Sequence, residues 1–285
     1  MAERTSLFLA TGVIASVLLA LGLVMMKSRG KQLQPARGRG FWRAVRGWFR
    51  DPMWLGGFGV QIVGYALYIV ALTGSPVSML AVMMQGGIAF FVLITMFFLH
   101  EHASGREWLG IIGVVAAMIL LSLSLGSGTE SNRADALSLT LTSAGAIVIG
   151  LLPYANERLR NGGLAAALTS GIAFGLGSLY AKAVTDIFAA NDSQPVFIGL
   201  VTSPWFYLAT IANLSGMVLL QNSFHWARGI IAMPLSSACS NLVPIVGGIL
   251  AFGERLPSAT GPAAMRITAF TLTILSGSLL ATGRE

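Results

Sequence analysis

Charged residues are scarce in this chain. Only 10% of its 285 residues are Asp, Glu, Lys or Arg, whereas 55% are hydrophobic and the mean hydropathy is +0.75. A soluble domain carries about 25% charged residues, so this composition excludes an ordinary soluble domain. A membrane-spanning helix needs about 20 apolar residues, so the length allows on the order of ten spans and leaves no room for a soluble catalytic domain.

Cysteine is nearly absent, and the common catalytic motifs are missing. Cys239 is the single cysteine, which excludes an intrachain disulfide. No glycine-rich phosphate loop is present, and no nucleophile-elbow sequence accompanies His225. His100, Glu101 and His102 are adjacent, and adjacent residues do not converge on a metal as ligands four residues apart do. We therefore predict no catalytic residue, no resident metal and no cofactor, and a protein that is not an enzyme.

Long apolar runs bounded by charged or turn residues predict the fold class. An isolated strand in lipid would leave its backbone groups unpaired, so these runs are predicted to be helices. The fold expected is an all-α polytopic integral membrane protein with about nine transmembrane helices. The predicted spans are residues 6–26, 53–73, 76–99, 108–125, 136–152, 164–189, 205–222, 229–252 and 263–281.

Basic residues collect in the loop at residues 27–51. By the positive-inside rule this loop is cytoplasmic. Alternating nine helices from it places the N-terminus outside, the C-terminus inside, and thirteen of the 18 basic residues on the cytoplasmic side. We expect an integral protein of a bacterial inner membrane, and we attribute the net charge of +7 to topology, not to binding of nucleic acid. The basic residues of the loop are Lys27, Arg29, Lys31, Arg37, Arg39, Arg43, Arg46 and Arg50.

The second part of this loop has an amphipathic pattern. Its aromatic and apolar residues recur at helical spacing, and its arginines fall on the other face. This pattern is typical of a short interfacial helix that contacts anionic membrane lipids between Arg39 and Arg50. A cluster that serves only to orient the chain is the alternative. The apolar set is Phe41, Trp42, Val45, Trp48 and Phe49, and the basic set is Arg39, Arg43, Arg46 and Arg50.

The two halves of the chain can be aligned with each other. Glu101 and Glu254 each follow an apolar helix and lie 153 residues apart, and Lys27 and Lys182 lie 155 apart. Four helices in each half with one extra helix between them would place the halves in opposite orientations, as in the inverted repeats of secondary transporters. The predicted division is a first repeat at 1–130, a connecting helix at 131–160 and a second repeat at 161–285.

The residues of these repeats resemble a known family. Residues 71–120, with Gly110 and Gly113, look like the EamA-like half of the drug/metabolite transporter superfamily, and Pro244 followed by the segment 253–256 is closer still. Members usually have five helices per half, whereas here the basic loop stands in place of the second helix. The nine-helix plan is similar to the NIPA-type magnesium transporter branch, with Lys27 ending the first helix and Lys182 in the sixth. The resemblance implies transport by alternating access.

Polar residues within predicted spans are the candidate site. In lipid such residues are expensive and commonly functional, although they also serve as bonds between helices. Lys182 is a cation that suits an anionic cargo group. Glu101, Pro244 and Glu254 are predicted structural or gating residues. The predicted substrate-binding set is Gln61, Tyr65, Gln85, Lys182, Asn213, Gln221, Ser237 and Asn241.

Carboxylates are missing from the centres of the predicted spans. Magnesium sites usually use one or two carboxylates, so their absence favours a small organic solute as the cargo. The first hypothesis is therefore a drug/metabolite-type secondary transporter, acting without ATP and possible as a homodimer. A NIPA-like magnesium permease and a non-transporting, lipid-interacting membrane subunit are the alternatives.

Overall fold

The computed structural model describes residues 2–36, 40–72, 77–124, 135–161, 163–190, 199, 201–253 and 260–281. Every regular element in these residues is a helix. A long helix overlaps each predicted span. These are α1 (Ala2–Ser28), α3 (Pro52–Leu72), α4 (Val77–Leu99), α5 (Gly105–Ser124), α6 (Ala136–Leu151), α8 (Leu164–Ala190), α10 (Pro204–Trp226), α11 (Gly229–Ala251) and α12 (Thr260–Ala281). Three short helices accompany them, namely α2 (Phe41–Trp48), a 3-10 helix (Leu152–Ala155) and α7 (Glu157–Asn161).

The helices have the length and surface of membrane spans. Within the described residues, five are long and apolar enough to cross a bilayer: α1, α6, α8, α11 and α12. Large apolar side chains remain exposed on the outside of the bundle, among them Leu141, Leu214 and Ile274. Such a surface is unfavourable in water and matches hydrocarbon. The prediction of an all-helical polytopic membrane protein is confirmed, and the number of nine crossings stays a prediction.

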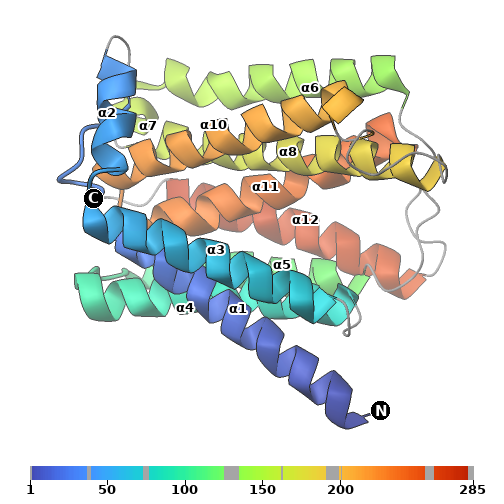
Figure 1. Ribbon diagram of the computed structural model, residues 1–285, viewed down its shortest axis with the longest axis horizontal. Coiled ribbons are helices and arrows are strands. Elements are labelled where there is room, and N and C mark those ends of the chain that lie inside the picture. Colours follow the sequence, from blue (N-terminus) through green and yellow to red (C-terminus); the bar gives the residue numbers. More distant parts are fainter. Residues whose placement is uncertain are drawn as a thin grey trace.

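The long helices pack in two sets with the same order of neighbours. In the first set, α1 packs against α3 and α4, and α4 packs against α5. In the second set, α8 packs against α10 and α11, and α11 packs against α12. The helices α5 and α12 join the sets, and α6 lies outside on α8 and α11. Figure 1 shows the two sets side by side in one bundle. We refer to α1, α3, α4 and α5 as the first set and to α8, α10, α11 and α12 as the second set.

Glycines let the most closely packed helices approach. A Cβ atom on Gly22 of α1 would lie 2.6 Å from the carbonyl oxygen of Gly57 on α3, and a Cβ on Gly57 would lie 2.7 Å from the carbonyl oxygen of Gly22. On α8, a Cβ on Gly171 would lie 2.1 Å from the carbonyl oxygen of Ser236 on α11. Small residues of this kind are typical of helix interfaces in membranes, where close packing is the main attraction.

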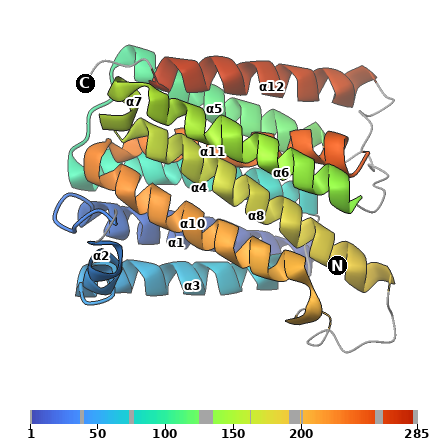
Figure 2. The same ribbon diagram turned by 90° about the horizontal axis from the view of Figure 1, so that it is seen from above.

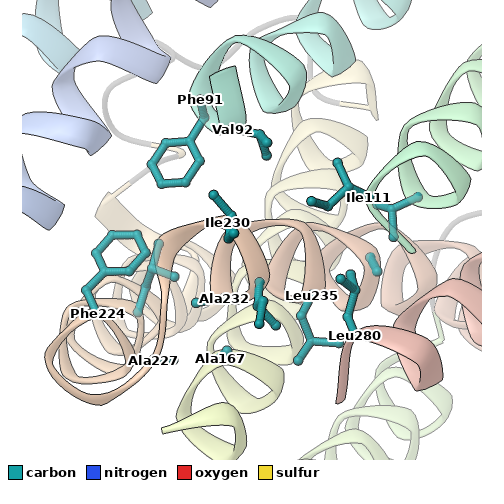
Figure 3. Close-up of a cluster of buried hydrophobic side chains, with 14 of the residues drawn as sticks. Phe91, Val92, Ile111, Ala167, Phe224, Ala227, Ile230, Ala232, Leu235 and Leu280 are labelled. Carbon is teal, nitrogen blue, oxygen red and sulfur yellow. The ribbon is translucent and has the colours of Figure 1, made fainter. Parts of the chain in front are cut away.

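The first half of α11 lies at the centre of the core. Figure 3 shows Ile230 and Leu235 of this helix between side chains from both sets. Beside Ile230, Phe91 of α4 stacks on Phe224 of α10 with ring centroids 6.1 Å apart, and both rings are buried. The packed aromatic pair therefore joins the first set to the second near the end of α10.

The helix α2 packs against the first turns of α3. Trp48 is buried, and its ring centroid lies 5.9 Å from that of Trp54 at the start of α3. Phe41 and Val45 pack against the same cluster, whereas Trp42 remains exposed. The predicted apolar face thus packs mostly on protein, because Trp54 offers an aromatic surface that only tertiary structure brings close. Figure 1 shows α2 running across the direction of the long helices at one end of the bundle.

Candidate functional site

Lys27 occupies a buried position where α1 meets the end of α10. Its side chain is 3% exposed, and its Nζ donates hydrogen bonds to the carbonyl oxygens of Phe224 at 3.0 Å and Ala227 at 2.7 Å. The last carbonyls of a helix lack partners within that helix, and the negative end of the helix dipole lies there. The ammonium group of Lys27 therefore caps α10 from another helix.

Glu101 neutralises Lys27 and caps the next helix. Its Oε1 lies 3.5 Å from Nζ of Lys27, and its Oε2 accepts a hydrogen bond of 3.1 Å from the backbone N–H of Ile230 in the first turn of α11. A carboxylate is stabilised at a helix N-terminus. The predicted structural or gating residue Glu101 thus lies where α10 ends and α11 begins.

A second ion pair supports the same corner from α5. Arg228 directly precedes α11, and its guanidinium donates to the carbonyl oxygen of His102 at 2.7 Å and to the carboxylate of Glu107. Glu107 is 1% exposed and also accepts a hydrogen bond from the backbone N–H of Ser104. We call Lys27, Glu101, Glu107 and Arg228 the corner cluster. In this cluster, charged side chains of the first set and of the loop after α4 contact the connection between α10 and α11.

The segment after α1 is tied to α10 by polar contacts. Asn222 makes two hydrogen bonds with the backbone of Ala36, at 2.7 Å to the N–H and 3.1 Å to the carbonyl oxygen. His225 Nδ1 lies 2.8 Å from the carbonyl oxygen of Gly30. These contacts hold the described part of the basic loop, residues 29–36, against the second set.

Asp51 anchors the far end of this loop. Its carboxylate pairs with Arg29 at 2.7 Å and accepts a hydrogen bond of 2.9 Å from the backbone N–H of Trp54, at the start of α3. Burial alone raises the pKa of Asp51, but the hydrogen bonds and the charge of Arg29 outweigh it and hold the pKa below its usual range. Asp51 is therefore an ionised cap of α3.

The predicted substrate-binding residues are spread over several helices. Asn241 donates a hydrogen bond of 2.8 Å to the carbonyl oxygen of Ser237, another member of the set, one turn earlier in α11. Asn213 bonds the carbonyl oxygen of Ala209 on its own helix and packs against α8. Gln61 packs against α1, and Tyr65 is 62% exposed. No common site for the full set is assembled by these contacts in the described part of the chain.

The other predicted residues lie in different environments. Gln221 is buried, and its Nε2 lies 3.5 Å from the carbonyl oxygen of Met26, beside the corner cluster. Lys182 holds its Nζ 4.2 Å from the centroid of the Phe252 ring. Pro244 lies within α11, at the contact with Gly175 of α8. The side chain of Gln85 and the whole of Glu254 lie outside the described residues.

An apolar groove of about 610 Å³ opens between α6, α8 and α11. Its lining includes Ile172 of α8 and Cys239, Val243 and Val246 of α11. None of the predicted binding residues lines it. The groove lies among membrane helices, and its apolar walls fit hydrocarbon better than a polar cargo.

The corner cluster contains residues that the sequence did not single out as a site. Lys27 served only as an anchor of the repeat, because its bonds to Phe224 and Ala227 are with backbone carbonyls about 200 residues away, which leave no mark in the sequence. For Glu107 there was a signal, the Ser104-to-Glu107 spacing of a capping box. In the described residues no group of three or more His, Cys, Asp or Glu side chains is placed to hold a metal ion.

The fold and its apolar surface define an integral membrane protein built of helices. No family model matches the chain. In a comparison with curated proteins, the chain is similar to a probable magnesium transporter NIPA9 of Arabidopsis thaliana, with 24% identity over 257 residues, 84% of this chain and 72% of that protein.

Proposed function

We propose that this protein is a membrane transporter that conducts magnesium ions, similar in function to NIPA-type transporters. The observation that carries the proposal is the similarity to the probable magnesium transporter NIPA9, which extends over most of both chains. A similarity of this extent covers both helix sets and is not confined to one apolar helix. It favours the magnesium permease over the organic-solute transporter that the sequence favoured.

The arrangement of the helices supports transport by alternating access. The first and second sets repeat the same order of neighbours, and α5 and α12 join them. This is the packing expected of two inverted repeats related by an axis between them. In such transporters one set rocks against the other, so that a central path opens to one side at a time. The drug/metabolite transporter plan and the division into repeats at 1–130 and 161–285 belong to this proposal.

The corner cluster supplies a gate for one end of this path. Lys27 and Glu101 hold the corner between α10 and α11 through polar contacts, which can exchange with water when the sets separate. Apolar side chains cannot replace their packing contacts with hydrogen bonds to water in this way. Charged groups buried among membrane helices are costly and are commonly functional. The cluster therefore closes the end at which α1 finishes and α11 begins.

Hydrated magnesium fits the limited set of acidic residues. Mg²⁺ releases its waters reluctantly and is commonly held by one or two carboxylates with several waters retained. A path for the hydrated ion needs amide, hydroxyl and carbonyl oxygens, and does not need a cage of three acids. Gln221, whose Oε1 is buried without a hydrogen-bond partner among the described residues, offers such an oxygen next to the corner cluster.

Flux in proteoliposomes tests the proposal. The full chain is reconstituted into vesicles loaded with a magnesium-sensitive dye, and we expect saturable Mg²⁺ entry above that of empty vesicles. Glu101→Gln should lower the maximal flux severalfold, because it weakens the closed corner on which each transport cycle depends. It should change KM little, because the path of the ion stays in place. Arg160→Gln is the control, since it breaks only the exposed pair with Glu157. Vesicles that hold folded protein but take up no Mg²⁺ would exclude the proposal.

A small organic solute is the second candidate. The cation of Lys182 above the Phe252 ring favours an organic anion as the cargo. Counterflow of labelled anionic metabolites in the same vesicles distinguishes the two. Counterflow with no Mg²⁺ entry would assign the protein to this class.

A further inference from the structure

A basic groove borders α2 at the end of the bundle. It has a volume of about 810 Å³ and lies between α2 and the loop segment 32–34. We call it the arginine groove. Its lining residues are Gln32, Leu33, Gln34, Trp42, Arg43, Ala44, Val45, Arg46, Gly47 and Arg50.

Three arginines line the groove: Arg43, Arg46 and Arg50. Arg43 and Arg46 lie on α2, about 60° apart around the helix, and Arg50 lies in the turn that follows it. All three side chains are exposed. The structure shows no ion pair of these three arginines with any other residue in the ranges it describes. Three guanidinium groups on one side of a groove attract an anion that reaches all of them.

The walls of the groove are held in place by the protein. On the α2 side, Ala44 and Trp48 are buried against the protein, so the helix cannot roll. On the loop side, Trp48 Nε1 donates a hydrogen bond of 3.1 Å to the carbonyl oxygen of Gln34, and Asn222 holds Ala36 by two hydrogen bonds. The arginines therefore stand on a preformed support, which lowers the entropic cost of binding an anion.

The position of the groove matches the headgroup level of a membrane. The helix α2 crosses the ends of the long helices, as Figure 1 shows, and Figure 2 shows the same helix close to end-on beside α1 and α3. Trp42, which lines the groove, is 78% exposed, and Phe49 is 50% exposed. Exposed aromatic rings next to basic residues at the end of a bundle are typical of the interface between headgroups and hydrocarbon.

From this geometry we infer that the arginine groove binds the headgroup of an anionic phospholipid. Arg43, Arg46 and Arg50 contact the phosphate, and the Trp42 ring lies along the glycerol and upper acyl region. The exposed aromatic rings favour a lipid over a soluble phosphate compound. This inference is independent of the cargo, because none of the groove residues belongs to the corner cluster or to the predicted substrate-binding set.

Lipid binding to the purified full chain in neutral detergent tests the inference by native mass spectrometry. The probes are dioleoylphosphatidylglycerol, dioleoylphosphatidylcholine as the neutral lipid and glycerol 3-phosphate as the soluble phosphate. We expect the wild type to prefer phosphatidylglycerol about tenfold, and the double variant Arg43→Gln/Arg50→Gln to lose this preference. The matched control Arg106→Gln/Arg160→Gln removes two exposed charges outside the groove and should keep it.

Each outcome has one meaning. A preference that survives in the Arg43→Gln/Arg50→Gln variant, or is lost equally in the control variant, would overturn the groove as the site. Displacement of bound phosphatidylglycerol by millimolar glycerol 3-phosphate would overturn the lipid and assign a soluble phosphate ligand. The single variants Arg43→Gln, Arg46→Gln and Arg50→Gln are measured in parallel. Because all three residues are exposed, these single variants are expected to fold, and each should weaken the preference.

Discussion

The Nζ of Lys27 and the Oε1 of Glu101 lie 3.5 Å apart at the corner where α10 ends and α11 begins. Lys27 satisfies the carbonyls that end α10, and Glu101 satisfies an N–H group that starts α11. Each charge therefore has two functions, since it neutralises the other and caps a helix of the second set. The pair makes the position of this corner depend on residues of the first set.

Lys27→Met should destabilise the protein strongly. The change leaves Glu101 without its cation and the two carbonyls at the end of α10, those of Phe224 and Ala227, without this donor. Loss of one partner of a buried pair costs about 3–5 kcal/mol. Thermal unfolding in detergent, followed by tryptophan fluorescence, should show a clearly lowered Tm. Lys27→Met/Glu101→Leu should lose less than the sum of the single losses, because no charge is left buried alone. Additive losses would show that the two residues act independently.

Gly171→Ala should separate α8 from α11. A Cβ at this position would lie 2.1 Å from the Ser236 carbonyl oxygen and 2.6 Å from Cys239 Cβ, so the helices must move apart. Overpacking of this kind costs about 1–3 kcal/mol. Gly145→Ala on α6 is the matched control, because a Cβ there meets no atom within 4 Å. A lowered Tm for Gly171→Ala and an unchanged or raised Tm for Gly145→Ala are expected, and equal values would contradict the close packing.

The helices were predictable from the sequence because apolar length is a local property. The predicted span 229–252 and the observed α11 (Gly229–Ala251) differ by one residue. The ends that were misplaced depend on polar partners. The helix α10 was predicted to end at residue 222, where polar residues begin, but it continues to Trp226. Asn222 stays within the helix because its side chain is buried and hydrogen-bonds the backbone of Ala36.

The candidate site was less predictable than the fold. The sequence predicted Lys182 as the basic residue inside a membrane span. In the structure Lys27 and Arg266 are more deeply buried, at 4% and 6% exposure. Both lie near a helix end in the sequence, where a long side chain is expected to reach water. Their burial depends on which helices cover those ends, and a single sequence does not contain that information.

The stabilisation by Asp51 should depend on pH, and Asp51→Asn should remove that dependence. The pKa of Asp51 is held below its ordinary value of about 3.9, so its contribution is present above that value and is lost as the pH falls through the lowered pKa. Asparagine keeps the cap of α3 but removes the charge, so the variant should lose about 1 kcal/mol at neutral pH. The difference in Tm from the wild type should persist from pH 7 to about 5 and shrink below about pH 4. The control Glu157→Gln, at an exposed side chain, should show no such difference in Tm. A Tm difference for Asp51→Asn that grew on acidification would exclude an ionised Asp51.

Cys239 reports whether water reaches the groove between α6, α8 and α11. It is the single cysteine of the chain and lines this apolar groove, so thiol labelling needs no engineered site. A thiolate is the reactive species, and hydrocarbon surroundings both disfavour it and exclude charged reagents. In native membranes we expect almost no reaction with a charged methanethiosulfonate. Trp42→Cys in a Cys239→Ser background should react rapidly, because Trp42 is 78% exposed at the end of the bundle. Fast labelling of Cys239 by the charged reagent, slowed by Mg²⁺ in the bath, would instead place the aqueous path of the cargo in this groove and move the site away from the corner cluster.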